Sequence, residues 1–264
     1  ENSNYYVFLI TNKHVLNEHK QVYLKFNSAV DTSSTDYVID LVAKNGKHIW
    51  VGHPDADVDV AVISIDANLL GVELRKYTFF TSDKQVLTSD QLKTEGVAEG
   101  DGIFVLGFPM GMVGAVRQYV ICRSGTMARI RDLHEGKAKN FLVDATVFPG
   151  NSGGPVIIRP EANSLVGTKP VKKASLIGIV KSYVPYVEFA SSQQTSNPRI
   201  RFEENSGLAL VEPVDHISQT VEVAIKRNRN RVAQARWKAK RQVPAQLNPA
   251  PNANTSPTGD APTS

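Results

Sequence analysis

Short apolar runs separated by turn-forming residues constrain the fold of this chain most strongly. Four of these runs combine β-branched and aromatic side chains as buried strands do, and they lie at residues 5–10, 60–65, 103–106 and 156–158. Gly, Asp and Asn are frequent between the runs, and few helical periodicities occur before residue 213. A chain of 264 residues that is 41% hydrophobic can bury one sizeable core or two small ones. We therefore predict an all-β protein built as a sandwich or a barrel.

The turn before the last of these runs carries the first chemical signal. It reads FPGNSGGP (residues 148–155), which sets Ser152 between glycines. A nucleophilic serine needs an exposed hydroxyl on a rigid turn, with backbone N–H groups directed at the oxyanion that its attack creates. Glycine permits such a turn because it has no Cβ atom and adopts φ > 0. Alone, the turn is equally typical of an ordinary strand connection, so the interpretation depends on partners for Ser152.

Two upstream residues are candidates for these partners. His14 follows the first predicted strand, and Asp59 stands at the start of the second. The chain order His, Asp, Ser with wide spacing is one of the known orders for a serine nucleophile, its histidine base and the acid that orients the base. Singly, His14 and Asp59 are more typical of surface residues, and their combination with the Ser152 turn favours catalysis. Asp55 and Asp57 are rival acids; Asp59 is preferred because it directly precedes Val-Ala-Val-Ile.

Five segments, in order along the chain, carry a family resemblance. They are ITNKHVL around His14, DVDVAVI around Asp59, FPGNSGGPV around Ser152, and the stretches at 100–111 and 123–127. Together they resemble the trypsin-like (chymotrypsin-fold) serine peptidases, and most closely their bacterial, disulfide-poor HtrA-like branch. The resemblance covers roughly residues 5–215. No PDZ-like pattern follows it, so we expect an HtrA-like chain without a PDZ domain.

The resemblance implies two antiparallel six-stranded β-barrels with the active site in the cleft between them, followed by a C-terminal helix. The family has one more strand before the histidine strand, and its absence here predicts a first barrel that lacks its first strand and carries an open edge. A polar, loop-like stretch near residues 88–100 is expected to separate the barrels. The predicted division is an N-terminal barrel at 1–95, a C-terminal barrel at 96–212, a basic helix at 213–242 and a disordered tail at 243–264.

The resemblance also implies a serine endopeptidase that acts on proteins or peptides. Ser152 would be the nucleophile, His14 the general base and Asp59 the acid that orients the imidazole, with the Gly150 and Ser152 N–H groups as oxyanion hole. The histidines form no H-E-x-x-H pattern, so neither a metal nor a cofactor is expected. The alternative interpretation is a latent or regulatory binding module with the same fold. Asn151 stands where trypsin-type zymogens carry an acid, so activation by a newly cut N-terminus is not expected.

A pocket for the substrate side chain is the least constrained part of the site. Its predicted lining comes from the family position about six residues before the serine and from a later strand: Thr146, Phe148, Lys181, Ser182 and Tyr183. No acid lies near the first position, so a preference for Lys or Arg is not expected, and Phe148 favours small or apolar side chains. The polar segment at 188–205 is predicted to be a long loop that overhangs the cleft, or else a surface insertion.

Charge and cysteine content bound the remaining functions. Residues 226–264 contain eight Lys and Arg and only Asp260 as an acid, a net charge of +7, so residues 1–225 carry −3 of the total +4. The stretch at 226–241, which includes Trp237, could bind nucleic acid or an anionic surface, although a solvated helix end is the simpler explanation. Cys122 is the only cysteine, no run approaches a membrane span, and no signal peptide is visible. These features favour a cytoplasmic location.

Overall fold

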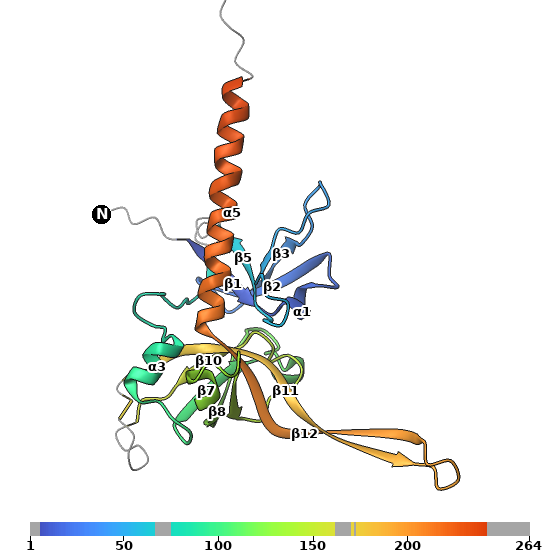
Figure 1. Cartoon of the computed structure of the whole chain (residues 1–264). Helices are drawn as coiled ribbons and strands as arrows, with labels where there is room; N and C mark the ends of the chain where they lie inside the picture. The colour runs from blue at the N-terminus through green and yellow to red at the C-terminus, as the bar shows by residue number, and fades with distance from the viewer. Residues whose placement is uncertain (1–5, 67–74, 162–169, 172, 242–264) are drawn as a thin grey trace, which may run out of the picture. The chain divides into compact units, whose positions relative to one another are not determined.

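The structure is a computed structural model that describes residues 6–66, 75–161, 170–171 and 173–241. The chain divides into a compact unit of residues 1–225 and a second unit of residues 226–264. Strands predominate in the first unit, and a long helix follows the last strand (Figure 1). The prediction of an all-β fold with a C-terminal helix is therefore confirmed.

The first half of the compact unit contains six strands arranged in two small sheets. In the described residues their pairings give two three-stranded sheets, with the orders β1–β5–β4 and β3–β2–β6. The strands β4 and β6 have two residues each. The elements are β1 (Val7–Thr11), α1 (Lys13–Leu16), β2 (Gln21–Ser28), β3 (Ser34–Asp40), β4 (Val51–Gly52), β5 (Ala61–Ile65) and β6 (Arg75–Lys76). β1 lies at a sheet edge, with β5 as its strand partner.

The second half forms the closed six-stranded antiparallel barrel that was predicted. Its strands follow the order β10–β11–β12–β9–β8–β7 around the barrel. The elements of this half are α3 (Ser89–Glu95), β7 (Gly102–Gly107), a 3-10 turn (Pro109–Gly111), β8 (Ile121–Arg129), α4 (Arg131–His134), β9 (Phe141–Asp144), β10 (Pro155–Ile158), β11 (Ser175–Ser191) and β12 (Pro198–Pro213). Buried Ile, Val and Phe side chains alternate along these strands and fill the barrel interior.

The stretch between the two halves, expected to be a loop, contains the helix α3. Thr88 caps it: the Thr88 hydroxyl accepts from the Gln91 N–H, and the Gln91 side chain accepts from the Thr88 N–H. This reciprocal pair is a capping box, a signal that the sequence carries as T-x-x-Q. Leu92 is the side chain that the helix buries. A helix with a single buried side chain has no apolar periodicity. The polar composition of this stretch therefore led to the prediction of a loop.

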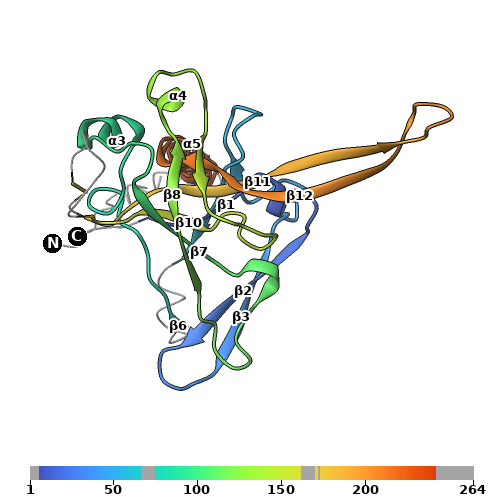
Figure 2. The ribbon, with the colours of Figure 1, turned by 90° about the horizontal axis from the view of Figure 1, so that it is seen from below.

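The segment at 188–205, also expected to be a loop, is a β-ribbon. The strands β11 and β12 continue well past the barrel as a two-stranded hairpin, paired from Gly178 opposite Pro213 to Ser191 opposite Pro198. Figures 1 and 2 show this ribbon projecting from the barrel. Both of its faces meet solvent, so the sequence has no alternation between a buried and an exposed face, and the strand pattern goes undetected.

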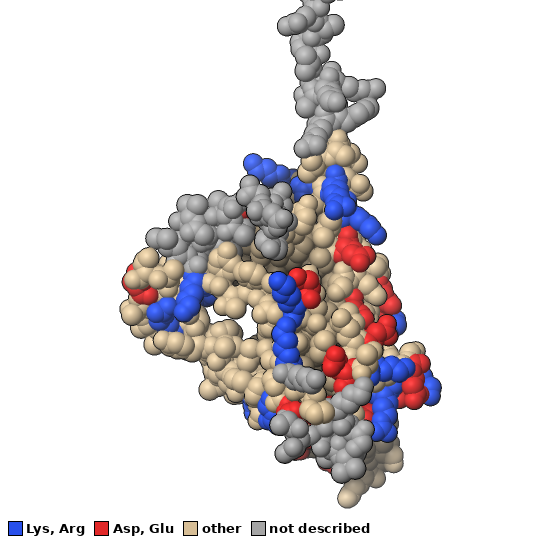
Figure 3. All heavy atoms as spheres, turned by 90° about the vertical axis from the view of Figure 1, so that its left-hand side faces the viewer, with Lys and Arg blue, Asp and Glu red and all other residues tan. Residues whose placement is uncertain are grey.

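A long helix, α5 (Val214–Arg241), ends the described chain. Within the compact unit its first turns bury Val214, Ile217, Thr220 and Ala224. Ile217 packs against Val58 and Val60, which precede β5, and against Ile179 of β11, so α5 closes a small core between the two halves. No helix in the described residues is long and apolar enough to cross a lipid bilayer. On the face drawn in Figure 3, basic and acidic side chains lie interspersed.

Candidate active site

His14 lies just beyond the end of β1, on the short helix α1. Asn12 caps this helix from extended backbone, and its fully buried amide donates to the Asp59 carbonyl at 2.7 Å. β1 pairs with β5 so that Thr11 faces Ala61, which brings the segment before β5 beside α1. The apolar run before His14 forms β1, and α1 follows β1 directly. The position of β1 therefore determines the position of His14.

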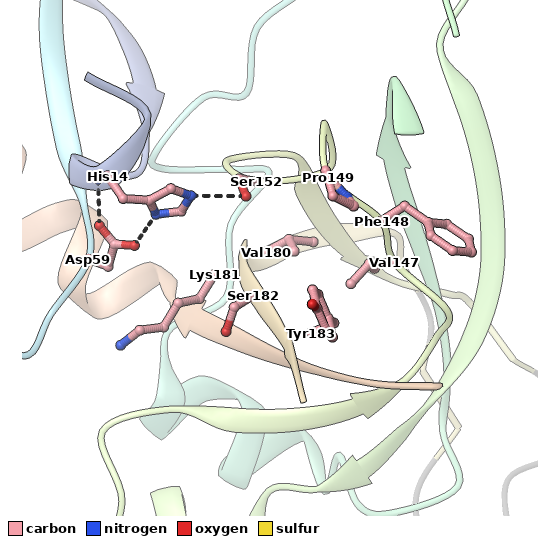
Figure 4. Close-up of a pocket in the computed structure, with 10 residues that line it drawn as sticks. All are labelled: His14, Asp59, Val147, Phe148, Pro149, Ser152, Val180, Lys181, Ser182 and Tyr183. Atoms are coloured by element: carbon pink, nitrogen blue, oxygen red, sulfur yellow. Dashed lines mark hydrogen bonds and ion pairs between the residues drawn. The ribbon is translucent and has the colours of Figure 1, made fainter. Parts of the chain in front are cut away.

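The structure brings His14, Asp59 and Ser152 together (Figure 4). The His14 Nδ1 atom lies 2.5 Å from Asp59 Oδ2, and His14 Nε2 lies 3.1 Å from Ser152 Oγ. The His14 backbone N–H also donates to Asp59 Oδ1 at 3.2 Å. Each imidazole nitrogen thus has one partner, the geometry by which a base takes a hydroxyl proton while a carboxylate orients its ring.

The rival acids make other contacts. Asp55 and Asp57 both pair with the Lys139 ammonium, at 2.7 Å and 3.0 Å. Hydrogen bonds from Lys139 and from the Asp57 N–H lower the pKa of Asp55 below its ordinary value. Lys139 lies in the second half of the compact unit, so this cluster fastens the Asp59 loop to that half.

Sequence reasoning missed a buried carboxylate behind Asp59. Glu212, near the end of β12, is fully buried and accepts the Asp59 N–H at 2.9 Å. The same carboxylate contacts the Lys181 ammonium at 2.9 Å and His216 Nδ1 of α5 at 2.6 Å. Asp59 is therefore held from both sides of its backbone, by Asn12 at the carbonyl and by Glu212 at the N–H. In the sequence, the only sign of this role is that Glu212 is a single acid at the end of an apolar run, residues 208–211.

The partners of Glu212 decide its charge. Burial acts to raise its pKa, but the His216 ring, the Asp59 N–H and Lys181 together outweigh burial and lower the pKa from 4.5 to about 2. Glu212 is therefore ionised at neutral pH although no solvent reaches it. A buried charge with three partners is a fixed electrostatic support for the segment that carries Asp59.

The turn around Ser152 depends on two glycines in the left-handed region. Gly150 has φ +96° and Gly153 has φ +76°. A Cβ atom on Gly153 would lie 2.6 Å from Thr11 Oγ1 and 3.0 Å from Thr11 Cα, so the turn packs directly against the end of β1. Asn151, 1% exposed, accepts the Phe148 N–H through Oδ1 at 3.0 Å and closes the turn from inside. The Met110 N–H donates to the Pro149 carbonyl at 2.6 Å from outside.

A cleft of about 410 Å³ opens beside the side chains of His14, Asp59 and Ser152. Four of the five predicted residues line the cleft; Thr146 is not among the lining residues, which include its neighbour Val147. The lining residues are His14, Asp59, Val147, Phe148, Pro149, Ser152, Val180, Lys181, Ser182 and Tyr183. The Lys181 ammonium is directed to Glu212 and to the Asp57 carbonyl at 2.9 Å, so the lining beside Ser152 is mainly apolar.

Two backbone donors of the turn remain available. Across the described residues, neither the Gly150 N–H nor the Ser152 N–H has a hydrogen-bond partner. In the same part of the chain, no three His, Cys, Asp or Glu side chains gather as ligands for a metal ion. The arrangement is thus a hydroxyl, an imidazole, a carboxylate and two free N–H groups beside an apolar cleft, the set that acyl transfer requires.

Comparison with known proteins identifies the family. A model of the trypsin-like peptidase domain matches residues 2–167, and the chain belongs to this family. The closed barrel and the mostly β structure fit that fold. A search of the curated proteins found no match.

Proposed function

We propose that the protein is a serine endopeptidase with Ser152 as its nucleophile. The observation that carries the proposal is the line of contacts from Asp59 through both nitrogens of His14 to the Ser152 hydroxyl, at 2.5 Å and 3.1 Å. Ser152 Oγ attacks the scissile carbonyl while His14 takes its proton, and an acyl-enzyme forms as the amine leaves with a proton from His14. Water then repeats the sequence and releases the acid. Asp59 keeps the imidazole oriented and stabilises its charged form.

The Gly150 and Ser152 N–H groups would hold the oxyanion during both attacks. Their lack of partners supports this role, since a free N–H on a rigid turn is ready to donate when negative charge develops. Removing one donor of this kind in other enzymes costs about 10²–10³ in kcat. Asn151 supports the turn as a neutral acceptor, so we propose that no newly cut N-terminus is needed to shape it.

The apolar cleft supports a preference for small or apolar side chains at the cleaved bond. Val147, Phe148 and Val180 contribute apolar wall, and the one ammonium in the lining, that of Lys181, is paired with Glu212. The assignment to the HtrA-like branch rests on the sequence motifs alone and remains a prediction.

Labelling with a fluorophosphonate probe tests the proposed function. The probe reacts with a serine only where a base and an oxyanion hole activate it, so the wild-type chain should be labelled and the Ser152→Ala variant should not. Circular dichroism of both chains controls for folding. A folded wild-type chain that resists the probe would instead favour the latent binding module.

A further inference from the structure

The last part of α5 carries charge of a single sign. Residues 226–241 contain eight Lys and Arg, and no Asp or Glu occurs from residue 223 to residue 259. The surface of the compact unit is different. On the face drawn in Figure 3 acidic side chains lie among basic ones, and the surface helix α3 exposes Asp90, Lys93 and Glu95. Solvation alone explains a polar helix end, but it does not explain the exclusion of acids.

The basic positions share one broad side of the helix. Successive residues of an α-helix are about 100° apart around its axis, so the eight basic positions fall within an arc of about 220°. The remaining arc continues the face on which Ile217 and Ala224 are buried, and its positions are Asn228, Val232, Ala235 and Ala239. None of the described side chains from 225 to 234 is buried, and Arg229 and Arg231 are exposed. The basic side is therefore the one that lies away from the packed face.

Such an arrangement is unfavourable for a helix that binds nothing. Arg227 and Arg231 are four positions apart, as are Arg236 and Lys240, and like charges at this spacing repel each other. The helix dipole stabilises cations near the C-terminus, but only within the last turn, so it does not account for the basic residues from 226 to 231. A polyanion bound along the helix would replace this repulsion by attraction.

The density and the type of the cations match the backbone of a nucleic acid. Residues 226–241 span about 24 Å of helix, so a cation occurs about once per 3 Å of axis. Phosphates along one strand of a DNA duplex are about 3.4 Å apart. Five of the eight cations are Arg, whose planar guanidinium donates to two phosphate oxygens at once. Asn228, Asn230 and Gln234 add amide groups of the kind that contact phosphate and sugar.

The same stretch lacks what a membrane surface or a protein partner would require. Val232 and Trp237 are its only apolar residues larger than alanine. A separation of five positions places them about 140° apart around the helix, so they form no stripe. An interfacial membrane helix needs an apolar face, and the centre of a protein interface is apolar as well. The residue types therefore favour nucleic acid over both.

We propose that residues 226–241 of α5 bind a nucleic-acid duplex along its phosphate backbone, without regard to base sequence. Phosphate contacts supply the affinity, and they carry no information about the bases. This function is separate from the proposed hydrolysis and does not depend on it. Because α5 begins within the compact unit, the bound helix carries that unit to nucleic acid.

Fluorescence anisotropy of a fluorescein-labelled DNA duplex of about 20 base pairs, and of an RNA duplex with the same sequence, measures binding by the full chain. NaCl is varied from about 0.05 M to about 0.3 M, because counterion release makes log K fall linearly with log [NaCl]. At least one duplex should bind, and the tighter one identifies DNA or RNA as the partner. For DNA the slope should be about −3 to −4, since about half of the eight cations can face one duplex.

A triple variant, Arg229→Gln/Arg231→Gln/Arg236→Gln, removes three cations from the stretch and keeps good helix formers in their place. It should weaken binding by about tenfold or more at about 0.1 M NaCl and reduce the magnitude of the slope by about 2. The matched control, Arg129→Gln/Arg131→Gln/Lys137→Gln, removes three exposed cations from the compact unit. It should change the Kd by less than about threefold, because salt screens charges that do not contact the duplex.

Four results overturn the proposal: no binding of either duplex at about 0.1 M NaCl, equal losses from the two triple variants, a salt slope that the helix variant leaves unchanged, or competition by another polyanion as effective as that by unlabelled duplex. The competitors are poly-L-glutamate and vesicles with about 30% phosphatidylserine, which would assign the stretch to an acidic protein or to a membrane surface. Both triple variants should keep wild-type fluorophosphonate labelling. Failure of the wild-type chain to react with fluorophosphonate would count against the proposed hydrolysis alone, because duplex binding does not depend on Ser152.

Discussion

Glu212 accepts the Asp59 N–H at 2.9 Å and, with Asn12 at the Asp59 carbonyl, holds the backbone of the proposed catalytic acid. Its pKa of about 2, against an ordinary 4.5, corresponds to about 3 kcal/mol of stability at neutral pH. Because the folded-state pKa is the lower one, this contribution is complete above about pH 4.5 and is lost as the pH falls toward 2. Glu212→Gln should therefore lower the free energy of unfolding by about 3 kcal/mol at pH 7, and by progressively less below pH 4.5.

Urea unfolding between pH 7 and pH 3 measures the effect of Glu212→Gln. The control is Glu135→Gln, which removes the exposed partner of Lys137 and should change stability by no more than about 0.5 kcal/mol. A loss for Glu212→Gln that is constant across this pH range would show that packing, rather than charge, explains it.

Asp59 and Asp57 are two residues apart but have different partners, His14 and Lys139. Replacing each by Asn should therefore affect the labelling rate differently. Asp59→Asn removes the acceptor that orients His14 and should slow fluorophosphonate labelling by about 10³–10⁴. Asp57→Asn removes an exposed partner of Lys139 and should leave the labelling rate within about twofold. The second-order labelling rate of each variant measures this difference, and similar rates for the two would remove Asp59 from the proposed mechanism.

Among the elements, the serine turn can be tested with two glycines of similar backbone conformation. A Cβ atom on Gly150 would lie 3.3 Å from the Met110 N atom and closer still to the Phe108 carbonyl, whereas Gly136, at φ +69°, has nothing within 4 Å. Gly150→Ala should move the oxyanion donors and slow labelling by about 10²-fold or more. Gly136→Ala carries the same positive-φ penalty, of the order of 1 kcal/mol, and should leave labelling unchanged. If Gly150→Ala and Gly136→Ala slowed labelling equally, the conformational penalty of a positive φ would explain the loss, and the oxyanion donors would not.

The elements also show which features the sequence could reveal. Strands with buried side chains, such as β5, β7 and β10, contain apolar runs that predicted them, and so does the partly buried β1. The residues at the ends of β1 and β5 and before β10 lie together in the site. The ribbon of β11 and β12 left no such run, because both faces are solvated. Glu212 escaped notice because its importance comes from partners 31 and 153 residues away, Lys181 and Asp59, that only the folded chain brings together.

Considered as a whole, the molecule joins its two halves through the start of α5 as well as through the cleft. Ile217 contacts both halves in one small core, and the His216 ring contacts the Glu212 carboxylate at 2.6 Å. His53, in the first half, also contacts Gln219 at 2.8 Å. These contacts all lie before residue 226, where the second unit begins. The basic stretch at 226–241 can therefore be removed separately from the support that α5 gives to the site.

Two truncations use this division. A chain that ends at Ile225 keeps every contact of α5 with the halves described above, so it should retain wild-type labelling and a Tm within a few degrees. A chain that ends at Pro213 loses the burial of Ile217, worth about 2 kcal/mol, and leaves Glu212 without one of its partners, worth about 3 kcal/mol more. A loss near 5 kcal/mol is comparable to the total stability of many domains, so this chain should unfold at a much lower temperature and resist labelling.

Thermal unfolding by circular dichroism, with labelling at 25 °C, compares the two truncated chains. Loss of labelling already at Ile225 would assign the basic stretch a role in the site itself, and normal behaviour at Pro213 would show that the two halves hold Asp59 without α5.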